Sequence, residues 1–182
     1  MKLDAFTTRR INEEGFSLLE MMFATIILLV GLVAVAQLVP ATILLNYRNR
    51  MDSSALVFAQ RELDQMLDQP LSASGSPPQF TDTLSNICYL GDPASPNTVQ
   101  GSPVLVSNNQ VLINFNVAPV ANFSFTYPDP TDPGRGTYDV RWAVIITGDG
   151  TSVSAKRIIL GVRQQGGSGY FQPITLDTVV QK

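Results

Sequence analysis

The chain has no histidine and a single cysteine, Cys88, among its 182 residues. A Ser-His-Asp triad and a Cys-His pair both need a histidine, and a Cys/His zinc site needs several such ligands. These three kinds of site are therefore excluded within this chain. A lone cysteine cannot form an intrachain disulfide, so we interpret Cys88 as a small apolar filler or a loop thiol. A bridge to another chain is the alternative.

The net charge is also small, because the chain has 12 Lys and Arg residues and 15 Asp and Glu residues. The six charges of residues 1–15 cancel, so the remainder carries the whole net charge of −3. The positive residues of this segment are Lys2, Arg9 and Arg10, and the negative ones are Asp4, Glu13 and Glu14. No broad basic surface is indicated, and we expect neither nucleic acid as a partner nor a bound cofactor.

Charge is absent altogether from residues 21–45, and Glu20 is the only charge between Glu14 and Arg48. As a helix, these 25 residues would span roughly 37 Å, more than the ~30 Å of a bilayer core. A carboxylate at the centre of such a segment costs about 2.5–3.5 kcal/mol, and less towards the interface. Glu20 is therefore a functional candidate, and it should have a cationic partner.

The segment Gly15 to Glu20 reads Gly-Phe-Ser-Leu-Leu-Glu and precedes the apolar run. It resembles the type III signal of type IV pilins and pseudopilins, and residues 28–38 are most similar to PilV-type minor pilins. The resemblance implies cleavage after Gly15, N-methylation of Phe16, and filament docking through Phe16 and Glu20. It also implies other pilin or pseudopilin subunits, a prepilin peptidase, inner-membrane assembly machinery and the membrane as partners.

We interpret residues 1–15 as a cleaved leader and residues 16–45 as a transmembrane or filament-core helix. A Sec signal would carry its apolar segment before the cut, whereas here that segment follows it. Leader Lys and Arg residues predict a cytoplasmic N-terminus in a single-pass inner-membrane protein. The chain would then move to a pilus or pseudopilus, at the cell surface or in the periplasm. An uncleaved signal anchor is the alternative, and the paired Glu13 and Glu14 depart from the usual basic leader end.

Two residues interrupt the apolar run, Gly31 and Pro40. Proline removes one helical hydrogen bond and clashes with the preceding turn. We therefore expect a kink or local loosening of the helix at these positions.

Residues 46–69 have an amphipathic pattern with a 3.6-residue period, and Pro70 should end the helix. The apolar stripe consists of Tyr47, Met51, Ala55, Phe58, Ala59, Leu63, Met66 and Leu67. Charged residues lie mostly off the stripe and are interpreted as a solvated face: Arg48, Arg50, Asp52, Arg61, Glu62, Asp64 and Asp68. One face of this helix can cover a sheet.

Residues 70–102 are rich in Ser, Pro, Gly and Asn, which is typical of a loop between helix and sheet. Residues 103–182 show alternating apolar residues and read as the sheet region. Asn108 and Asn109 suit a two-residue turn with positive φ, which would set Val106 opposite Val111. Further strands are expected around 123–127, 138–147 and 157–163, with a short one around 174–180. The sequence thus predicts an α+β fold, with a long helix on an antiparallel sheet of about four strands.

A hairpin is also predicted around Gly148 to Gly150. An odd number of loop residues would set Trp142 opposite Ile158 and keep the apolar residues of both strands on one face. A two-residue loop would instead set Trp142 opposite Arg157.

Two sites remain weak candidates. Asp129 and Asp132 lie in a proline-rich turn and could bind calcium, although such Asp-Pro pairs are ordinary turn residues. A basic strip on the exposed sheet face could contact DNA or an anionic surface, with solubility and edge protection as the plainer interpretation. This strip would consist of Arg135, Arg141, Lys156, Arg157 and Arg163.

Three function classes follow. The first is a minor type IV pilin, a non-enzymatic subunit that docks into or at the tip of a pilus and supports assembly, adhesion or motility. The second is a minor pseudopilin of a type II secretion system. A membrane-anchored envelope enzyme is third, and the missing histidine disfavours it.

Overall fold

The computed structural model describes residues 15–71, 79–129, 136–165 and 173–181. The chain forms two compact units, one up to Asn46 and one from Tyr47 onward. A single long helix, α1 (Leu18–Leu67), contributes its first part to one unit and its second part to the other. The second unit also contains antiparallel sheets, so the fold class is α+β as expected.

Helix α1 begins with a side-chain cap. The backbone N–H of Glu20 donates to the hydroxyl of Ser17 at 3.2 Å, and the N–H of Met21 donates to the Ser17 carbonyl at 3.1 Å. Such N-caps stabilise a helix by about 1 kcal/mol, because they satisfy N–H groups that have no partner within the helix. The helix continues through Gly31 and Pro40. The kink expected there stays a prediction.

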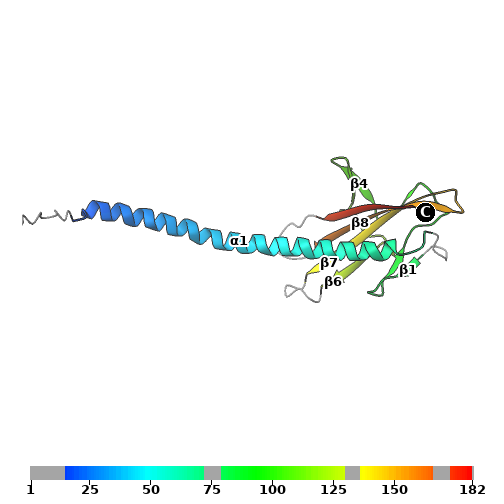
Figure 1. Ribbon diagram of the computed structural model, residues 1–182, viewed down its shortest axis with the longest axis horizontal. Helices are drawn as coiled ribbons and strands as arrows, with labels where there is room; N and C mark the ends of the chain where they lie inside the picture. Colours follow the sequence, from blue (N-terminus) through cyan, green and yellow to red (C-terminus); the bar gives the residue numbers. More distant parts are fainter. Residues whose placement is uncertain (1–14, 72–78, 130–135, 166–172, 182) are drawn as a thin grey trace, which may run out of the picture. The chain divides into compact units, whose positions relative to one another are not determined.

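The main sheet of the second unit has five strands in the order β3-β7-β8-β9, with β6 also paired to β7 (Figure 1). Its two long central strands are β7 (Thr137–Gly148) and β8 (Val153–Gln165). The shorter ones are β3 (Val99–Gly101), β6 (Ser124–Pro128) and β9 (Ile174–Gln181). All pairings in this sheet are antiparallel.

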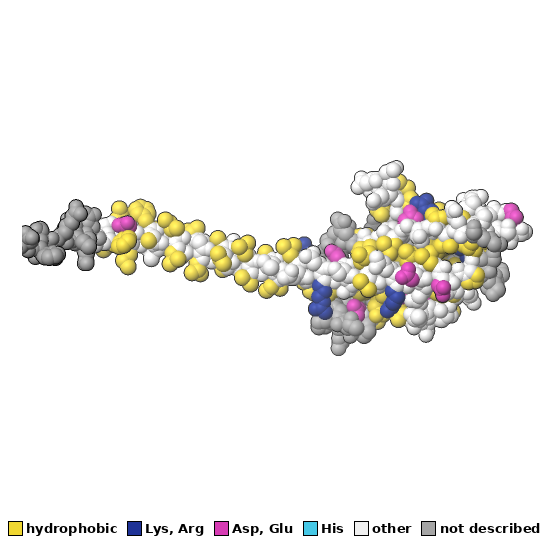
Figure 2. Space-filling model, in the orientation of Figure 1, with side chains coloured by type: hydrophobic (Ala, Val, Ile, Leu, Met, Phe, Trp, Pro, Cys, Tyr) yellow, Lys and Arg dark blue, Asp and Glu magenta, His cyan; other side chains and the backbone are white. Residues whose placement is uncertain are grey.

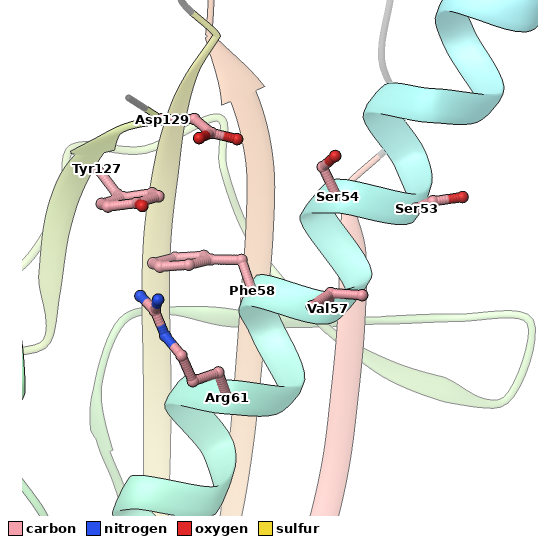
Figure 3. Close-up of a pocket in the computed structure, with 7 residues that line it drawn as sticks. All are labelled: Ser53, Ser54, Val57, Phe58, Arg61, Tyr127 and Asp129. Atoms are coloured by element: carbon pink, nitrogen blue, oxygen red, sulfur yellow. The ribbon is translucent and has the colours of Figure 1, made fainter. Parts of the chain in front are cut away.

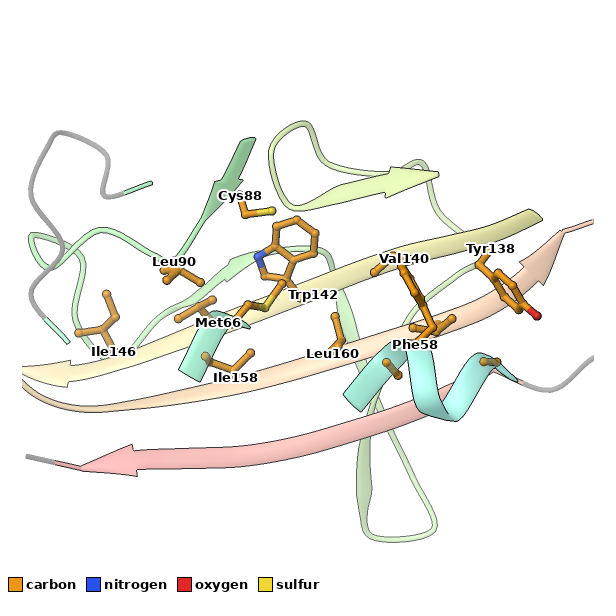
Figure 4. Packing of buried hydrophobic residues seen from close by; sticks show 14 of the residues in the cluster. Phe58, Met66, Cys88, Leu90, Tyr138, Val140, Trp142, Ile146, Ile158 and Leu160 are labelled. Carbon is orange, nitrogen blue, oxygen red and sulfur yellow. The ribbon is translucent and has the colours of Figure 1, made fainter. Parts of the chain in front are cut away.

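The C-terminal part of α1 packs on one face of this sheet and closes the main core (Figure 4). The predicted stripe is confirmed at its centre, because Met51, Ala55, Phe58, Ala59 and Met66 are all buried. The sheet contributes the inward residues of β7 and β8, among them Tyr138, Val140, Trp142, Ile158 and Leu160. The amphipathic pattern of α1 thus places its apolar face against the apolar face of the sheet.

A second, smaller core lies on the opposite face of the sheet. Ile113 and Phe115 pack there on Ala143 and Ile159. Gly161 makes this approach possible, since a Cβ at that position would lie 2.7 Å from the Cβ of Ile113. Strands β7 and β8 are therefore covered on both faces along part of their length.

Two small sheets accompany the main one, so the expectation of about four strands was too low. The pair β4 (Val104–Ser107) and β5 (Gln110–Ile113) forms a separate hairpin. Its register is the predicted one, with Val106 opposite Val111. Asn108 and Asn109 have φ values of 48° and 61°, as the predicted turn requires.

The region 70–102 contains three strands where the sequence predicted only loop. These are β1 (Gln79–Thr81), β2 (Ile87–Tyr89) and β3. Buried Cys88 and Leu90 anchor this region in the main core, and the indole N–H of Trp142 donates to the Tyr89 carbonyl at 2.9 Å. Short strands of three residues carry too little alternation for a sequence pattern to find them.

The β7–β8 hairpin keeps the predicted facing of apolar residues, but its register was predicted wrongly by two residues. Trp142 lies opposite Leu160, and neither Ile158 nor Arg157 is its partner. The loop is longer than expected because the Asp149 carboxylate accepts hydrogen bonds from the backbone N–H groups of Thr151 and Ser152. These bonds hold the pKa of Asp149 below its usual range, and the backbone N–H of Ser152 contributes most.

Candidate functional site

The N-terminal half of α1 exposes its apolar side chains on every side. Leu18 is 80% exposed and Leu28 is 66% exposed, and residues 15–50 are exposed throughout. Figure 2 shows hydrophobic side chains covering the visible face of this part of the helix. Among the described residues, α1 is the one helix long and apolar enough to cross a membrane. Such a surface is stable only where lipid or apolar protein covers it.

The processing and docking residues predicted from the sequence lie together at the start of this surface. Gly15 and Phe16 precede the first turn of α1, and Glu20 lies within it. Glu20 makes no ion pair with any described residue of its own chain. The cationic partner that we expect for this carboxylate therefore stays a prediction.

Ser17 is the residue of this region that the sequence reasoning overlooked. Its hydroxyl caps α1 by accepting the N–H of Glu20. The signal was present, because Ser17 and Glu20 have the Ser-x-x-Glu spacing of a capping box. Glu20 thus sits where a negative charge also meets the positive end of the helix dipole.

Gly31 leaves a shallow apolar hollow in the helix surface, with nothing within 4 Å of where its Cβ would be. The hollow is lined by Ile27, Leu28, Leu32, Val35, Ala36 and Val39. A missing side chain of this kind lets a neighbouring helix approach closely.

The second unit contains a mixed cavity of about 380 Å³ between α1 and β6 (Figure 3). Ser53, Ser54, Val57 and Phe58 line it from α1, together with Arg61, Tyr127 and Asp129. The Phe58 and Tyr127 rings stack at 4.3 Å, and the Arg61 guanidinium lies 4.8 Å from the Phe58 ring centre. The Ser53 hydroxyl donates to the Asn49 carbonyl, as a helical serine commonly does. The cavity is thus lined by the stacked rings of Phe58 and Tyr127 and by the Arg61 guanidinium.

Glu62 was expected on a solvated face, but it is fully buried. Its Oε1 accepts hydrogen bonds from Arg61 and Gln65, while Oε2 has no partner among the described residues. Burial, with the nearby Asp82 as a further cause, raises the pKa of Glu62. Gln65 extends the contact, because its Oε1 accepts the N–H of Thr83 at 2.9 Å.

Cys88 lies in the same part of the core and is buried. Burial first, and then the neighbouring carboxyls of Asp82 and Glu62, raise the pKa of its thiol to about 12. A buried thiol that stays protonated is a poor nucleophile. This supports the interpretation of Cys88 as an apolar filler over a bridge to another chain.

The weak alternative of a basic strip that contacts DNA or an anionic surface is not supported, because Arg141, Arg157 and Arg163 each form an ion pair with a carboxylate. Asp139 binds the buried Arg141 through two hydrogen bonds of 2.9 and 2.8 Å, and it also accepts one from Arg163 at 3.1 Å. Phe115 lies under both guanidinium groups, at 5.1 and 4.7 Å. Asp139 and Arg163 are cross-strand partners, which explains how they meet.

Lys156 and Arg157, the other described members of the strip, are likewise not free on that face. Arg157 forms an ion pair with Asp177, and Lys156 is buried on the α1 side of the sheet, opposite Ile146. Arg135 lies outside the described residues. The segment around Phe115 covers the face that was expected to be open.

Of the two weak calcium candidates, the structure describes only Asp129. Asp129 lines the cavity beside β6, and Asp132 lies outside the described residues. Within the described ranges no three His, Cys, Asp or Glu side chains are grouped to hold a metal ion.

Comparisons with known proteins give no relatives: no protein-family model matches the chain, and no curated protein or solved structure is detectably similar to it.

Proposed function

We propose that this chain is a minor type IV pilin, a structural subunit held in the inner membrane and then packed by its N-terminal helix into or at the tip of a pilus. The observation that carries the proposal is the first half of α1. It is apolar on all sides, it follows Gly15 and Phe16 closely, and its only charge is Glu20 in the first turn.

The proposal accounts for a surface that the chain itself leaves uncovered. Leucine, isoleucine and valine side chains of residues 18–45 are exposed, which is stable inside a bilayer and equally stable against the same helix of neighbouring subunits. The hollow at Gly31 offers close helix contact in the second setting. One segment therefore serves before and after assembly.

Glu20 supplies the specificity that an apolar helix surface lacks. In a filament core its carboxylate would face the α-amine of Phe16 from a neighbouring subunit, since no described residue of its own chain neutralises it. Losing one partner of a buried pair costs about 3–5 kcal/mol, because the other charge stays buried and unpaired. The interaction of the Glu20 charge with the helix dipole accounts for only about 0.3–1 kcal/mol.

Processing is tested by intact mass. We expect the mature chain to begin at Phe16, leaving 167 residues (182 − 15) and an added N-methyl group. The mass is measured on membrane or filament material from cells with and without the prepilin peptidase. A chain that keeps residues 1–15 in both strains would contradict the proposal.

Docking is tested by Glu20→Leu. Removing the charge makes membrane insertion easier, so the variant should be cleaved and present in the membrane at wild-type level. It should be missing from sheared filaments, because the neighbouring amine loses its partner. Leu19→Ala is the matched control, since it alters an adjacent exposed apolar residue and leaves the charge in place.

Normal incorporation of Glu20→Leu would overturn the docking role and leave Glu20 only its favourable interaction with the helix dipole. The same residues would serve in a pseudopilus of a type II secretion system. That candidate predicts that deletion of the gene abolishes protein secretion. It also predicts that the subunit is not found in sheared surface filaments.

A further inference from the structure

We infer that Tyr47–Arg50, four residues of α1 that we term the collar, binds the phosphates of lipid headgroups through Arg48 and Arg50. The inference goes beyond the proposed function and rests only on its membrane-spanning part.

The length of the collar matches the layer that it would occupy. The charge-free run ends at Leu45, and Met51 is already part of the folded core at 2% exposure, with its sulfur 3.9 Å from the Tyr138 hydroxyl. Four helical residues rise about 6 Å. The headgroup region on each side of a bilayer is roughly 5–7 Å thick. The collar is therefore as long as the headgroup layer is deep.

Both arginines are available for a ligand outside the chain. Arg48 and Arg50 are exposed, and neither takes part in an ion pair between described residues. This is unlike Arg61, Arg141, Arg157 and Arg163, each of which has a carboxylate partner. Asp52 lies on the same helix but within 4 Å of neither guanidinium. The collar thus has two cations without an ion partner among the described residues, next to the apolar run in α1.

The chemistry of the collar fits phosphate in particular. A guanidinium presents a planar fork of donors that matches phosphate oxygens and pairs with them bidentately. Residues two apart on a helix point to different sides, so Arg48 and Arg50 would contact different lipids. Tyr47 precedes them, and tyrosine is enriched at membrane–water interfaces, where its ring meets apolar chains and its hydroxyl meets water. Asn49 adds a further polar group.

The consequence is that the second unit is held at the membrane surface until the subunit leaves the bilayer. Extraction into a filament would break both phosphate contacts, so the collar opposes extraction. A subunit without the two guanidinium groups would keep its membrane-spanning helix but lose the two phosphate contacts.

The test measures contact between guanidinium carbon and lipid phosphorus. The full chain is labelled with ¹³C at arginine Cζ and reconstituted into phosphatidylglycerol and phosphatidylcholine bilayers. All versions carry Arg9→Lys and Arg10→Lys, so that leader arginines do not contribute. We expect ¹³C–³¹P dipolar dephasing in this parent chain, loss of dephasing in Arg48→Gln/Arg50→Gln, and retention in Arg157→Gln, whose arginine already pairs with Asp177.

Two further arms identify the source of phosphate and separate this inference from the proposed function. In phosphate-free digalactosyldiacylglycerol bilayers we expect no dephasing. Dephasing should also stay absent when inorganic phosphate is added to these bilayers. Dephasing that appears on addition of inorganic phosphate would overturn a contact specific to lipid headgroups. A carbonate wash reports on the span. A chain that resists the wash but shows equal dephasing with and without Arg48 and Arg50 overturns the collar alone. A chain released by the wash overturns the collar and the membrane anchor together.

Discussion

The two halves of α1 are built from similar apolar residues, but they meet their partners in different ways. In the second half, the apolar residues form one stripe and the sheet of the same chain buries it; Phe58 is only 6% exposed. In the first half, apolar residues surround the helix and the chain buries none of them. A stripe indicates a partner within the chain, whereas an all-round apolar helix indicates a partner outside it.

Charge follows the same division. In the second unit, buried Asp139 has its cations, Arg141 and Arg163, in the same sheet. In the first unit, Glu20 has no ion partner among the described residues. The predictions below measure how much stability each region draws from its own chain.

The largest effect is expected from Asp139→Ala. It leaves the buried Arg141 guanidinium without a carboxylate, which costs about 3–5 kcal/mol of unfolding free energy. Trp142 is the only tryptophan and is buried, so its fluorescence during urea unfolding reports on this unit. Asp177→Ala is the matched control, because it breaks a partly exposed pair with Arg157 worth roughly 0–1 kcal/mol. Equal losses of unfolding free energy in the two variants would contradict the assignment of Asp139 and Arg141 as a buried ion pair.

Phe58→Ala and Leu28→Ala compare the two halves of α1 directly. Phe58 stacks on Tyr127 and lies in the main core, so its truncation should cost about 3–5 kcal/mol in the same unfolding measurement. Leu28 is exposed in the single chain, and its truncation should change that value by less than about 0.5 kcal/mol. A large effect of Leu28→Ala would show that the first half of α1 packs within its own chain.

Lys156→Met should stabilise the protein. Lys156 is buried, its Nζ has no hydrogen-bond partner among the described residues, and burial lowers its pKa. Replacing it by an apolar side chain of similar length removes an unsatisfied buried group that costs about 1–3 kcal/mol. Lys156→Gln keeps a polar group there and should give little of this gain. A lower unfolding midpoint for Lys156→Met than for the wild type would refute the explanation.

Local patterns predicted the elements whose cause is local. The stripe of α1 follows from the spacing of Met51, Ala55 and Phe58, and the β4–β5 register follows from the turn preferences of Asn108 and Asn109. The cleavage predicted after Gly15 is a covalent change that the fold of the chain does not test, and it stays a prediction. For the start of α1, sequence reasoning singled out Glu20 but overlooked Ser17, although the Ser-x-x-Glu spacing was legible.

Features that depend on distant residues were predicted wrongly. Arg141 alternates with apolar residues along β7 and so reads as solvent-facing, but the segment around Phe115 covers that face and Asp139 neutralises the charge. The β7–β8 register was also predicted wrongly, although the side-chain bonds of Asp149 that shape its loop are local. The residue periodicity of a strand does not predict which other segment of the chain will cover its outer face.

Glu62 gives the smallest expected effect and the one with a distinct pH signature. Burial raises its pKa above the ordinary value of 4.5, so the folded state favours the protonated carboxyl. This contribution to stability is fully present below pH 4.5 and is lost as the pH rises through the folded-state pKa. Glu62→Gln keeps the size of the side chain and an oxygen that can accept from Arg61 and Gln65, but it cannot ionise. The unfolding free energy of the variant minus that of the wild type should therefore be constant in acid and should increase from about pH 4.5 towards neutrality. A difference that stays constant over this range would show that the Glu62 carboxyl is as well solvated in the folded chain as in the unfolded one.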